Sequence, residues 1–586
     1  MRILSFSPHN YFPVHSYPEG LFLDNLVQQG HEVLTVNCNG VLKGFCLCFF
    51  NTTISQKDIH RKRCLTCKRI RDDVNKEFKL RSIYLDTYLE AKDYRDTENI
   101  LININVSNIH DFLIDDIPIG KYSGYEFNLN HKLNSGNIPE HLWTERREIL
   151  RNSILTHKAI HKIYNSFKPD RTVAYNSLYS VNRVVCAVSE LQKIPHFSIH
   201  AGNNLDTRLQ QLMVYKGYGY VVNNRDFVTL SRNKPCTSEQ LKSVRKHIFE
   251  LFAAKSPWVY TQKSRNLSTS SLRKTLNITL KQKVLLAVMR SNDERKAAED
   301  SGFIFHDSTP IFKDQIEWCN FLINYAFKNP NNFIIFRVHP REFPNKREGV
   351  TSQFAKEFLK FIKKSTIPSN FYFNLPVDKI SVHDLYKITD LVLNNSSTVG
   401  LEASLLGIPV IGCGDVLYSF DPALQKEPRS MDDYSRMISR EVEVGLCAKR
   451  IIIAFRWLRY FSEHVCIDIS DGYKVTNKSR INKVLIKFRS LLSRFGLSIE
   501  ALSSLEVLSR NKPLENSKWL AYTVINDVED HIDYRNLEYS NDSKAEKNLI
   551  QECFLQYANA ICSKDDYVYK KQISIIASQF SNSIEP

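Results

Sequence analysis

Short hydrophobic runs alternate with helical patterns along the first half of the chain. The runs "RILSFS", "HEVLTVNC", "RTVAYNS" and "PHFSIHAG" are rich in β-forming residues, and "GLFLDNLVQQG" between the first two repeats apolar residues at helical spacing. Strands that alternate with helices in this way are typical of βαβ units in a parallel sheet. The pattern predicts a doubly wound α/β domain, with the first helix beginning near Gly20.

The same alternation resumes after a polar, serine-rich stretch at 264–279. The runs that predict strands there are "VLLAV", "FIIFRV", "FYFNL", "LVLNN" and "PVIG", again separated by helical patterns. We therefore predict the class α/β, with two doubly wound Rossmann-like domains facing a cleft and a mostly helical C-terminal extension. The predicted domains are 1–265, with a cysteine-containing insertion at about 38–80, then 280–470, and the extension 471–586.

Composition narrows the class of protein. A length of 586 residues exceeds what one core usually supports, and a formal charge of +16 suggests an anionic partner, such as nucleic acid, a phosphorylated substrate or a membrane surface. The start "MRILSFSPHNYF" predicts a buried strand instead of a signal peptide, and no apolar run reaches the roughly 20 residues of a spanning helix. Thirteen cysteines, an odd number, favour a reducing compartment. We expect a cytoplasmic location.

Two polar motifs follow strands of the second domain directly. "HPRE" follows one strand and "NNSST" follows another, so both should lie on the cleft side. A helix that begins at Ser397 or Thr398 would offer free backbone N–H groups to a phosphate. We expect His339 and Arg341 to add positive charge and Glu402 to accept ribose hydroxyls; the alternative is that the serines only cap the helix and His339 is structural. The predicted donor-site residues are His339, Arg341, Asn395, Ser396, Ser397, Thr398 and Glu402.

These motifs carry a resemblance to a known family. "RVHPRE" followed by "DLVLNNSSTVGLEASLLGIPVIG" resembles the His-Pro and Ser-Ser pair of two-domain GT-B glycosyltransferases that use CMP-activated sugars, such as bacterial sialyltransferases and capsular Kdo transferases. "SPHNYFPVHSYPEGLFLDNLVQQGHEV" is similar to the start of capsule biosynthesis proteins, and the likeness spans about residues 1 to 420. It implies that His339, Ser396 and Ser397 hold the donor phosphate. Glu402, Gly407 and Pro409 also match the family pattern.

The resemblance implies an activity. It implies a glycosyltransferase that moves a sugar from a nucleotide-activated donor, with CMP favoured, onto a growing surface polysaccharide (capsule, O-antigen or lipopolysaccharide) or a lipid-linked glycan. CDP-glycerol glycerophosphotransferases share the His-Pro motif but carry an aspartate-tyrosine pair where this chain has Asn394-Asn395. UDP-sugar transferases and epimerases remain alternatives. A nucleic-acid-binding protein is a distant one, because no recognised module is present, and we expect no nucleic-acid partner.

The first domain should hold the acceptor and the catalytic base. The loop after the first strand carries His9, His15 and Glu19, and an imidazole or carboxylate with a tuned pKa can take a proton from an acceptor hydroxyl. We predict Glu19 and His15 as catalytic residues, with His200 in reserve. The alternative is that Glu19 caps its helix and His15 packs.

Cysteines concentrate in the predicted insertion. "RCLTCKR" has the C-x2-C spacing of a metal knuckle, and four thiolates, Cys38, Cys46, Cys64 and Cys67, would close around a structural zinc. No second C-x2-C pair follows, so the alternative is that these cysteines are small apolar fillers.

A basic amphipathic pattern covers residues 481–496. A helix of this kind can lie on an anionic lipid surface, which would place the protein peripherally on the inner membrane. The alternative is ordinary packing against the body of the protein.

Overall fold

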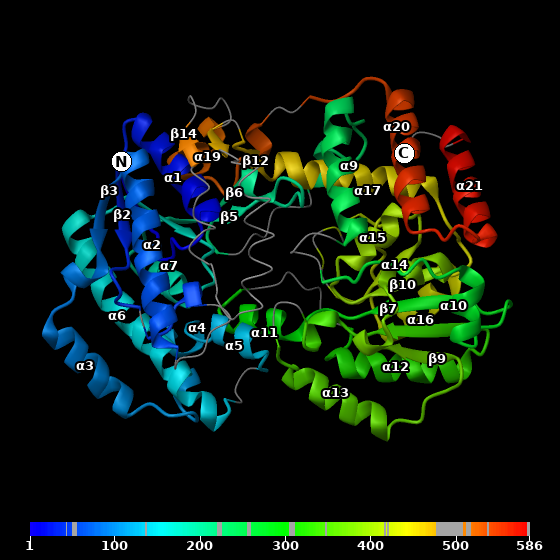
Figure 1. The fold of residues 1–586 in the computed structure, drawn as a ribbon, viewed down its shortest axis with the longest axis horizontal. Helices are drawn as coiled ribbons and strands as arrows, with labels where there is room; N and C mark the ends of the chain where they lie inside the picture. The colour runs from blue at the N-terminus through cyan, green and yellow to red at the C-terminus, as the bar shows by residue number, and fades with distance from the viewer. Residues whose placement is uncertain are drawn as a thin grey trace.

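The computed structural model describes residues 1–582 except 43, 50–55, 135–137, 219–225, 255–259, 304–310, 346–348, 415, 417, 419–420, 471, 476–507, 511–516 and 536–537. Two lobes lie side by side, the first in blue and cyan and the second mainly in green and yellow (Figure 1). Each lobe is built around its own sheet.

The first sheet has the strand order β12-β6-β5-β4-β1-β2-β3. Its strands are parallel except at one edge, where β6 runs antiparallel to both β5 and β12. The bounds are β1 Arg2–Phe6, β2 Glu32–Asn37, β3 Arg81–Tyr84, β4 Arg171–Tyr175, β5 His196–Ala201, β6 Gln211–Lys216 and β12 Ile467–Asp468.

Helices cover both faces of this sheet because successive strand residues point to opposite sides. Ile3 of β1 packs with helices α1, α2 and α19, whereas Leu4 and Phe6 pack on the other face with α3, α6 and α7. The helices of this lobe are α1 Pro13–Gln28, α2 Lys57–Glu77, α3 Ala91–Ile102, α4 Ile119–Tyr122, α5 Tyr125–His131, α6 Trp143–Phe167 and α7 Ser180–Leu191.

The second sheet is entirely parallel, in the order β11-β10-β7-β8-β9. Leu285 and Ala287 of β7 face α12, α13 and α16, and Val284 and Leu286 face α15 and α17. The strands are β7 Lys283–Val288, β8 Asn332–Arg337, β9 Phe371–Asn374, β10 Leu391–Asn394 and β11 Val410–Gly412. The helices are α10 Thr269–Thr275, α11 Asn292–Asp300, α12 Gln315–Lys328, α13 Gln353–Lys364, α14 Val382–Leu385, α15 Val399–Leu405, α16 Met431–Glu441 and α17 Ala448–Arg459.

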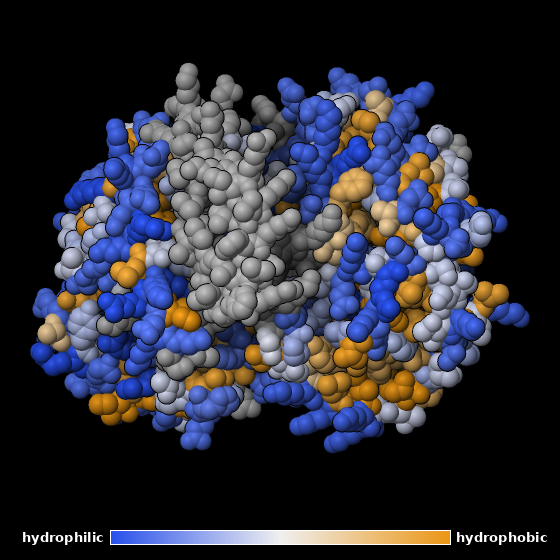
Figure 2. All heavy atoms as spheres, viewed as in Figure 1, coloured by the Kyte–Doolittle hydropathy of each residue, from blue (hydrophilic) through white to orange (hydrophobic). Residues whose placement is uncertain are grey.

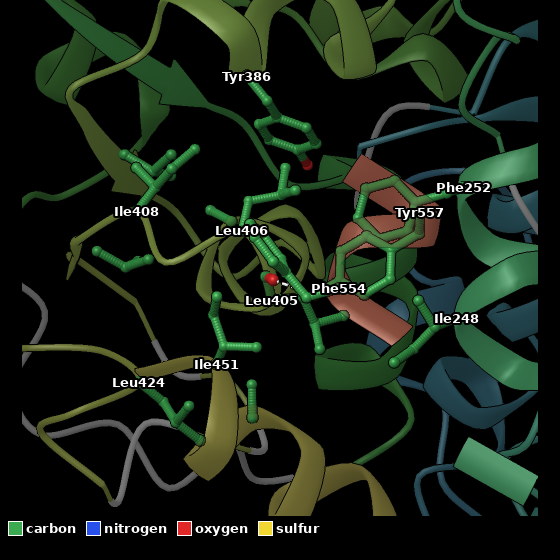
Figure 3. Close-up of a cluster of buried hydrophobic side chains, with 14 of the residues drawn as sticks. Ile248, Phe252, Tyr386, Leu405, Leu406, Ile408, Leu424, Ile451, Phe554 and Tyr557 are labelled. Carbon is green, nitrogen blue, oxygen red and sulfur yellow. Dashed lines mark hydrogen bonds between the residues drawn. The ribbon is translucent and has the colours of Figure 1, made fainter. Parts of the chain in front are cut away.

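The packing crosses the predicted domain boundaries. Helix α9, Ser238–Ala253, precedes the second sheet in sequence, yet Ile248 and Phe252 pack against Leu405, Ile451 and Tyr557 in the core of the second lobe (Figure 3). The remaining elements are α8 Asp226–Leu230, β13 Tyr473–Val475, β14 Leu508–Arg510, α19 Ser517–Asn526, α20 Ser543–Ala560 and α21 Tyr567–Asn582.

The described C-terminal extension is shared between the lobes. Its helix α19 packs on α1 in the first lobe, and α20 and α21 pack on α17 in the second. Just before it, β12 pairs with β6, so the chain returns to the first sheet after completing the second. The boundaries 1–265, 280–470 and 471–586 stay predictions.

The predicted fold class is confirmed by these topologies: both sheets are doubly wound, and the described residues after the second sheet are mostly helical. No helix among the described residues is long and apolar enough to cross a bilayer. Hydrophilic side chains are spread over both lobes on the face drawn in Figure 2. The basic amphipathic pattern at 481–496 lies outside the described residues.

Candidate active site

Each sheet has one topological switch point. From β1 the chain proceeds outward to β2 and β3, and from the neighbouring β4 it proceeds the other way to β5. In the second sheet the corresponding neighbours are β7 and β10. In open α/β sheets, ligands bind in the crevice beyond the carboxyl ends of the strands at this point. We therefore expect ligand-binding residues at these two crevices.

A cavity of about 690 Å³ opens at the switch point of the first sheet. Ser7 and His9 line it from the end of β1, and Tyr175 and Asn176 line it from the end of β4. The second lobe also contributes, because Arg341 lies in its wall. The predicted residues His15 and Glu19, and the reserve residue His200, all line this cavity.

Helix α1 carries both predicted catalytic residues. We expected them in a loop, but the helix begins at Pro13 and so includes His15 and Glu19. The start is earlier because Pro13 occupies the first helical turn, where a missing N–H costs nothing. The residue that flanks the start is Phe12, so Glu19 does not cap this helix.

Glu19 is a buried carboxyl with a pKa suited to proton transfer. Its side chain accepts hydrogen bonds from the hydroxyls of Ser7 at 2.8 Å and Ser5 at 3.4 Å. Burial raises the pKa of Glu19 to about 7, against the opposing effect of both serine hydroxyls. A general base works best with a pKa near the operating pH. Glu19 meets this condition from within the cavity.

His15 and His200 are uncharged near neutral pH. Burial, with a smaller effect from the cationic Arg208, lowers the pKa of each imidazole to about 4. Nδ1 of His15 lies 2.7 Å from the hydroxyl of Tyr175, and the ring of Tyr175 stacks on His200 at 6.2 Å between centroids. Such weak bases suit positioning and hydrogen bonding better than proton abstraction, so Glu19 is the stronger candidate base.

Two polar side-chain atoms at the switch point of the second sheet have no hydrogen-bond partner in the part of the chain that the structure describes. Asn395 and Ser396 follow β10, and Ser396 adopts the left-handed region with φ of 53°. Oδ1 of Asn395 and Oγ of Ser396 are buried and have no hydrogen-bond partner among the described residues. Such atoms are costly to bury unless something else satisfies them. A bound ligand is one way to satisfy them.

A glycine and an arginine border these two groups. A Cβ built on Gly414 would come within 2.5 Å of Oγ of Ser396 and 3.2 Å of Oδ1 of Asn395, so the absence of a side chain leaves space there. The same Cβ would lie 3.6 Å from Nη1 of Arg290, which follows β7. The sequence analysis missed Arg290. A cation directly after the first strand of the second domain was the signal that could have found it.

The other two hydroxyls of the Ser-Ser-Thr turn differ from Ser396. Oγ of Ser397 accepts a hydrogen bond from the N–H of Val399, the first residue of α15, at 3.3 Å. The side-chain amide of Asn394 stabilises the turn by donating a hydrogen bond to the carbonyl of Ser397 at 3.0 Å. Thr398 is exposed. Their contact with a donor, like that of the whole predicted set, stays a prediction.

His339 follows β8 and is a neutral hydrogen-bond donor. Its Nδ1 accepts the backbone N–H of Arg341 at 3.2 Å, which leaves the proton on Nε2. Burial, aided by Arg341, Arg337 and Lys132, lowers the pKa of His339 to about 3. The positive charge that we expected of this residue is therefore absent at neutral pH. Its ring meets Tyr260, a residue of the cavity wall, at 5.8 Å between centroids.

Arg341 links the lobes. Its guanidinium donates to the carboxylate of Asp293 at 2.8 and 3.1 Å, to the hydroxyl of Tyr260 at 2.9 Å and to the carbonyl of Leu129 at 3.0 Å. Lys132 of the first lobe reinforces this junction through hydrogen bonds to the carbonyls of the loop after β8. The charge of Arg341 is thus already paired with Asp293.

Glu402 is a buried residue of α15, the helix that begins after the turn that follows β10. Its carboxylate accepts a hydrogen bond from the hydroxyl of Tyr386 at 2.9 Å and lies 3.5 Å from Nε2 of His383. Only 3% of the residue is exposed. The predicted contact with a ribose stays a prediction.

The predicted metal ligands do not all come together. Cys46 and Cys67 lie near one another and near His9. Cys38 follows β2, where its carbonyl accepts a hydrogen bond from Arg71, and Cys64 lies on α2. Of the four predicted cysteines, only Cys46 belongs to a group of potential metal ligands among the described residues, together with His9 and Cys48.

Comparisons with known proteins add only distant likenesses. No family model matches the chain, and no curated protein matches it. The chain is similar in structure to the UDP-GlcNAc 2-epimerase from Neisseria meningitidis bound to UDP-GlcNAc, at 12% identity over 79% of this chain and 98% of that one, with a TM-score of 0.24. It is also similar to the Methanocaldococcus jannaschii UDP-GlcNAc 2-epimerase, at 12% identity over 78% of this chain and 99% of that one, with a TM-score of 0.27. The calicheamicin glycosyltransferase CalG4 is 11% identical over 78% of this chain and 94% of its own, with a TM-score of 0.23. Scores this low carry no argument about the reaction.

Proposed function

We propose that this chain is a glycosyltransferase that moves a sugar from a nucleotide-activated donor to a glycan acceptor. The observation that carries the proposal is the pairing of two switch points. One has a buried carboxyl with a pKa near 7 in a cavity, and the other has, beside an arginine, polar atoms with no hydrogen-bond partner among the described residues. The first suits removal of a proton from a hydroxyl. The second suits a phosphate.

On the donor side, the nucleotide phosphate would lie against Ser396, Asn395 and Arg290. The hydroxyl of Ser396 can donate a hydrogen bond, and Arg290 supplies charge; together these stabilise negative charge on a leaving phosphate. His339 can donate from Nε2 without carrying a charge. The resemblance of the two motifs favours a CMP-linked sugar.

On the acceptor side, a sugar hydroxyl would enter the cavity of the first lobe. Glu19 would take its proton as the hydroxyl oxygen attacks the donor sugar, while His15 and Tyr175 would help to orient the acceptor. A cavity of about 690 Å³ has room for more than one sugar ring. This supports a glycan acceptor, and we propose a surface polysaccharide or lipid-linked glycan of the capsule or O-antigen type.

Nucleotide-dependent thermal stabilisation tests the donor site. A ligand at about 100 times its dissociation constant stabilises the folded state by roughly 2.7 kcal/mol, which a melting curve resolves. CMP, CDP, UMP, UDP and GDP are compared, and we expect CMP to give the largest shift. A larger shift with CDP would favour glycerophosphate transfer, and a larger shift with UDP would favour the UDP-sugar enzymes.

Variants locate the binding. Ser396→Ala and His339→Ala should reduce the melting shift, whereas Ser439→Ala on the exposed face of α16 should leave it unchanged. Transfer is then measured as a mass increase of a glycan acceptor supplied with the stabilising nucleotide linked to a sugar. The proposal fails if no nucleotide of the panel shifts the melting temperature at millimolar concentration.

A further inference from the structure

Three separate segments bring thiols and an imidazole together at one wall of the cavity. His9 comes from the loop after β1, Cys46 and Cys48 come from the segment after β2, and Cys67 comes from α2. The potential ligand atoms of His9, Cys46 and Cys48 all lie within 4.8 Å of one another. Sγ of Cys46 is 3.6 Å from Nδ1 of His9.

Cys67 approaches this group from α2. Its Sγ accepts a hydrogen bond from the backbone N–H of Asn10, the neighbour of His9, at 3.3 Å. The thiols of Cys67 and Cys48 are close enough for each to shift the pKa of the other. His9, Cys46 and Cys48 form the compact group, and Cys67 lies beside it, joined to the same loop through Asn10.

We propose that His9, Cys46, Cys48 and Cys67 bind a zinc ion. Three thiolates and one imidazole are a ligand set of structural zinc sites, with bonds of about 2.3 Å to sulfur and 2.0–2.1 Å to nitrogen. In a tetrahedral site such bonds place the donor atoms roughly 3.5 Å apart, which matches the separation of Cys46 and His9. The set shares Cys46 and Cys67 with the one expected from the sequence and replaces Cys38 and Cys64.

The neighbourhood already holds these segments in place. The ring of Phe49 stacks on His60 of α2 at 4.0 Å between centroids, and Nη1 of Arg63 donates to the carbonyl of Cys48 at 3.1 Å. A site whose ligands are positioned by other contacts loses less conformational entropy when it binds the ion.

Four protein ligands leave no coordination position for water, so the role of the ion is structural. It would join the loop after β1 to α2 and to the segment between them. Because that loop leads directly into α1, the ion would support the cavity wall without taking part in any reaction there. This site does not depend on the proposed transferase activity.

Metal analysis of the full chain, purified with a reductant and without added metal, tests the proposal. We expect about one zinc per chain. Replacement of the ion by Co²⁺ should give the thiolate-to-cobalt charge-transfer band and the strong visible bands of a tetrahedral thiolate site. Cys48→Ser and Cys67→Ser should lose the zinc, and the matched control Cys64→Ser, three residues away on α2, should keep it.

Several results would overturn the zinc site. A wild-type chain that holds no zinc and takes up no Co²⁺ would do so, as would a disulfide among these cysteines or full zinc retention by Cys67→Ser. Loss of zinc from Cys64→Ser would assign a different ligand set and also end the proposal. The cobalt spectrum of the wild-type chain needs no variant, so the test holds even where a serine variant does not fold.

Discussion

Glu19→Gln separates the proton-transfer role of this carboxyl from its structural role. Glutamine has nearly the same shape and keeps an oxygen that can accept the hydrogen bond from Ser7, but it cannot take a proton. If Glu19 is the base, kcat/KM of the wild-type chain should rise as pH increases through about 7, the pKa to which burial raises this carboxyl. The variant should lose this rise and be slower by about 10²–10⁴-fold.

Stability should change with pH in the opposite direction. A pKa raised from 4.5 to about 7 makes ionisation of buried Glu19 cost about 3 kcal/mol more than in the unfolded chain. Its contribution to stability is complete below pH 4.5 and is lost as pH rises through 7. Relative to Glu19→Gln, the wild-type chain should therefore lose about 3 kcal/mol of unfolding free energy between pH 4 and pH 8.

Urea unfolding and rate measurements across this pH range supply both quantities. Glu342→Gln is the matched control, because burial, and then the nearby Asp293, also raise the pKa of Glu342 to about 7, and Glu342 is fully buried. Glu342 is not among the residues that line the cavity. The control should reproduce the stability change and keep the rise of kcat/KM. Glu19→Gln with wild-type activity and an unchanged pH profile would refute the assignment.

Four further substitutions probe the donor site and the junction of the lobes. Ser396→Ala should weaken nucleotide binding about 10-fold or more in calorimetric titration. Ser397→Ala should mainly cost about 1 kcal/mol of stability in urea, because it removes the hydrogen bond to the first N–H of α15; the reverse order would contradict the roles given to the two hydroxyls. Gly414→Ala should abolish the nucleotide-induced melting shift, because the added Cβ would come within 2.5 Å of Oγ of Ser396, and an unchanged shift would place the nucleotide elsewhere. Arg341→Ala should lower the unfolding free energy by about 3–5 kcal/mol by leaving Asp293 buried without its partner, and a loss below 1 kcal/mol would show that this pair is weak.

The fold class was predictable because its signals are local. The β-rich run "RILSFS" ahead of a helical pattern predicts a strand of a parallel sheet, and in the structure its Ile3 and Leu4 lie in different cores. The order of strands and helices also places the motifs, since residues that directly follow a parallel strand lie at the carboxyl edge of its sheet. For that reason His339 and Ser396 could be assigned to the ends of β8 and β10 from the sequence alone.

Only the tertiary structure determines the partners of these side chains and the pKa values of their ionisable groups. Arg341 pairs with Asp293, 48 residues away, and Glu19 acquires its raised pKa only when the folded chain removes water from it. The thiols of Cys46 and Cys48 meet His9 because a loop and the segment after β2 converge. Local periodicity reports which face of an element is buried, whereas partner choice, desolvation and the meeting of distant segments depend on distances that exist only in the folded chain.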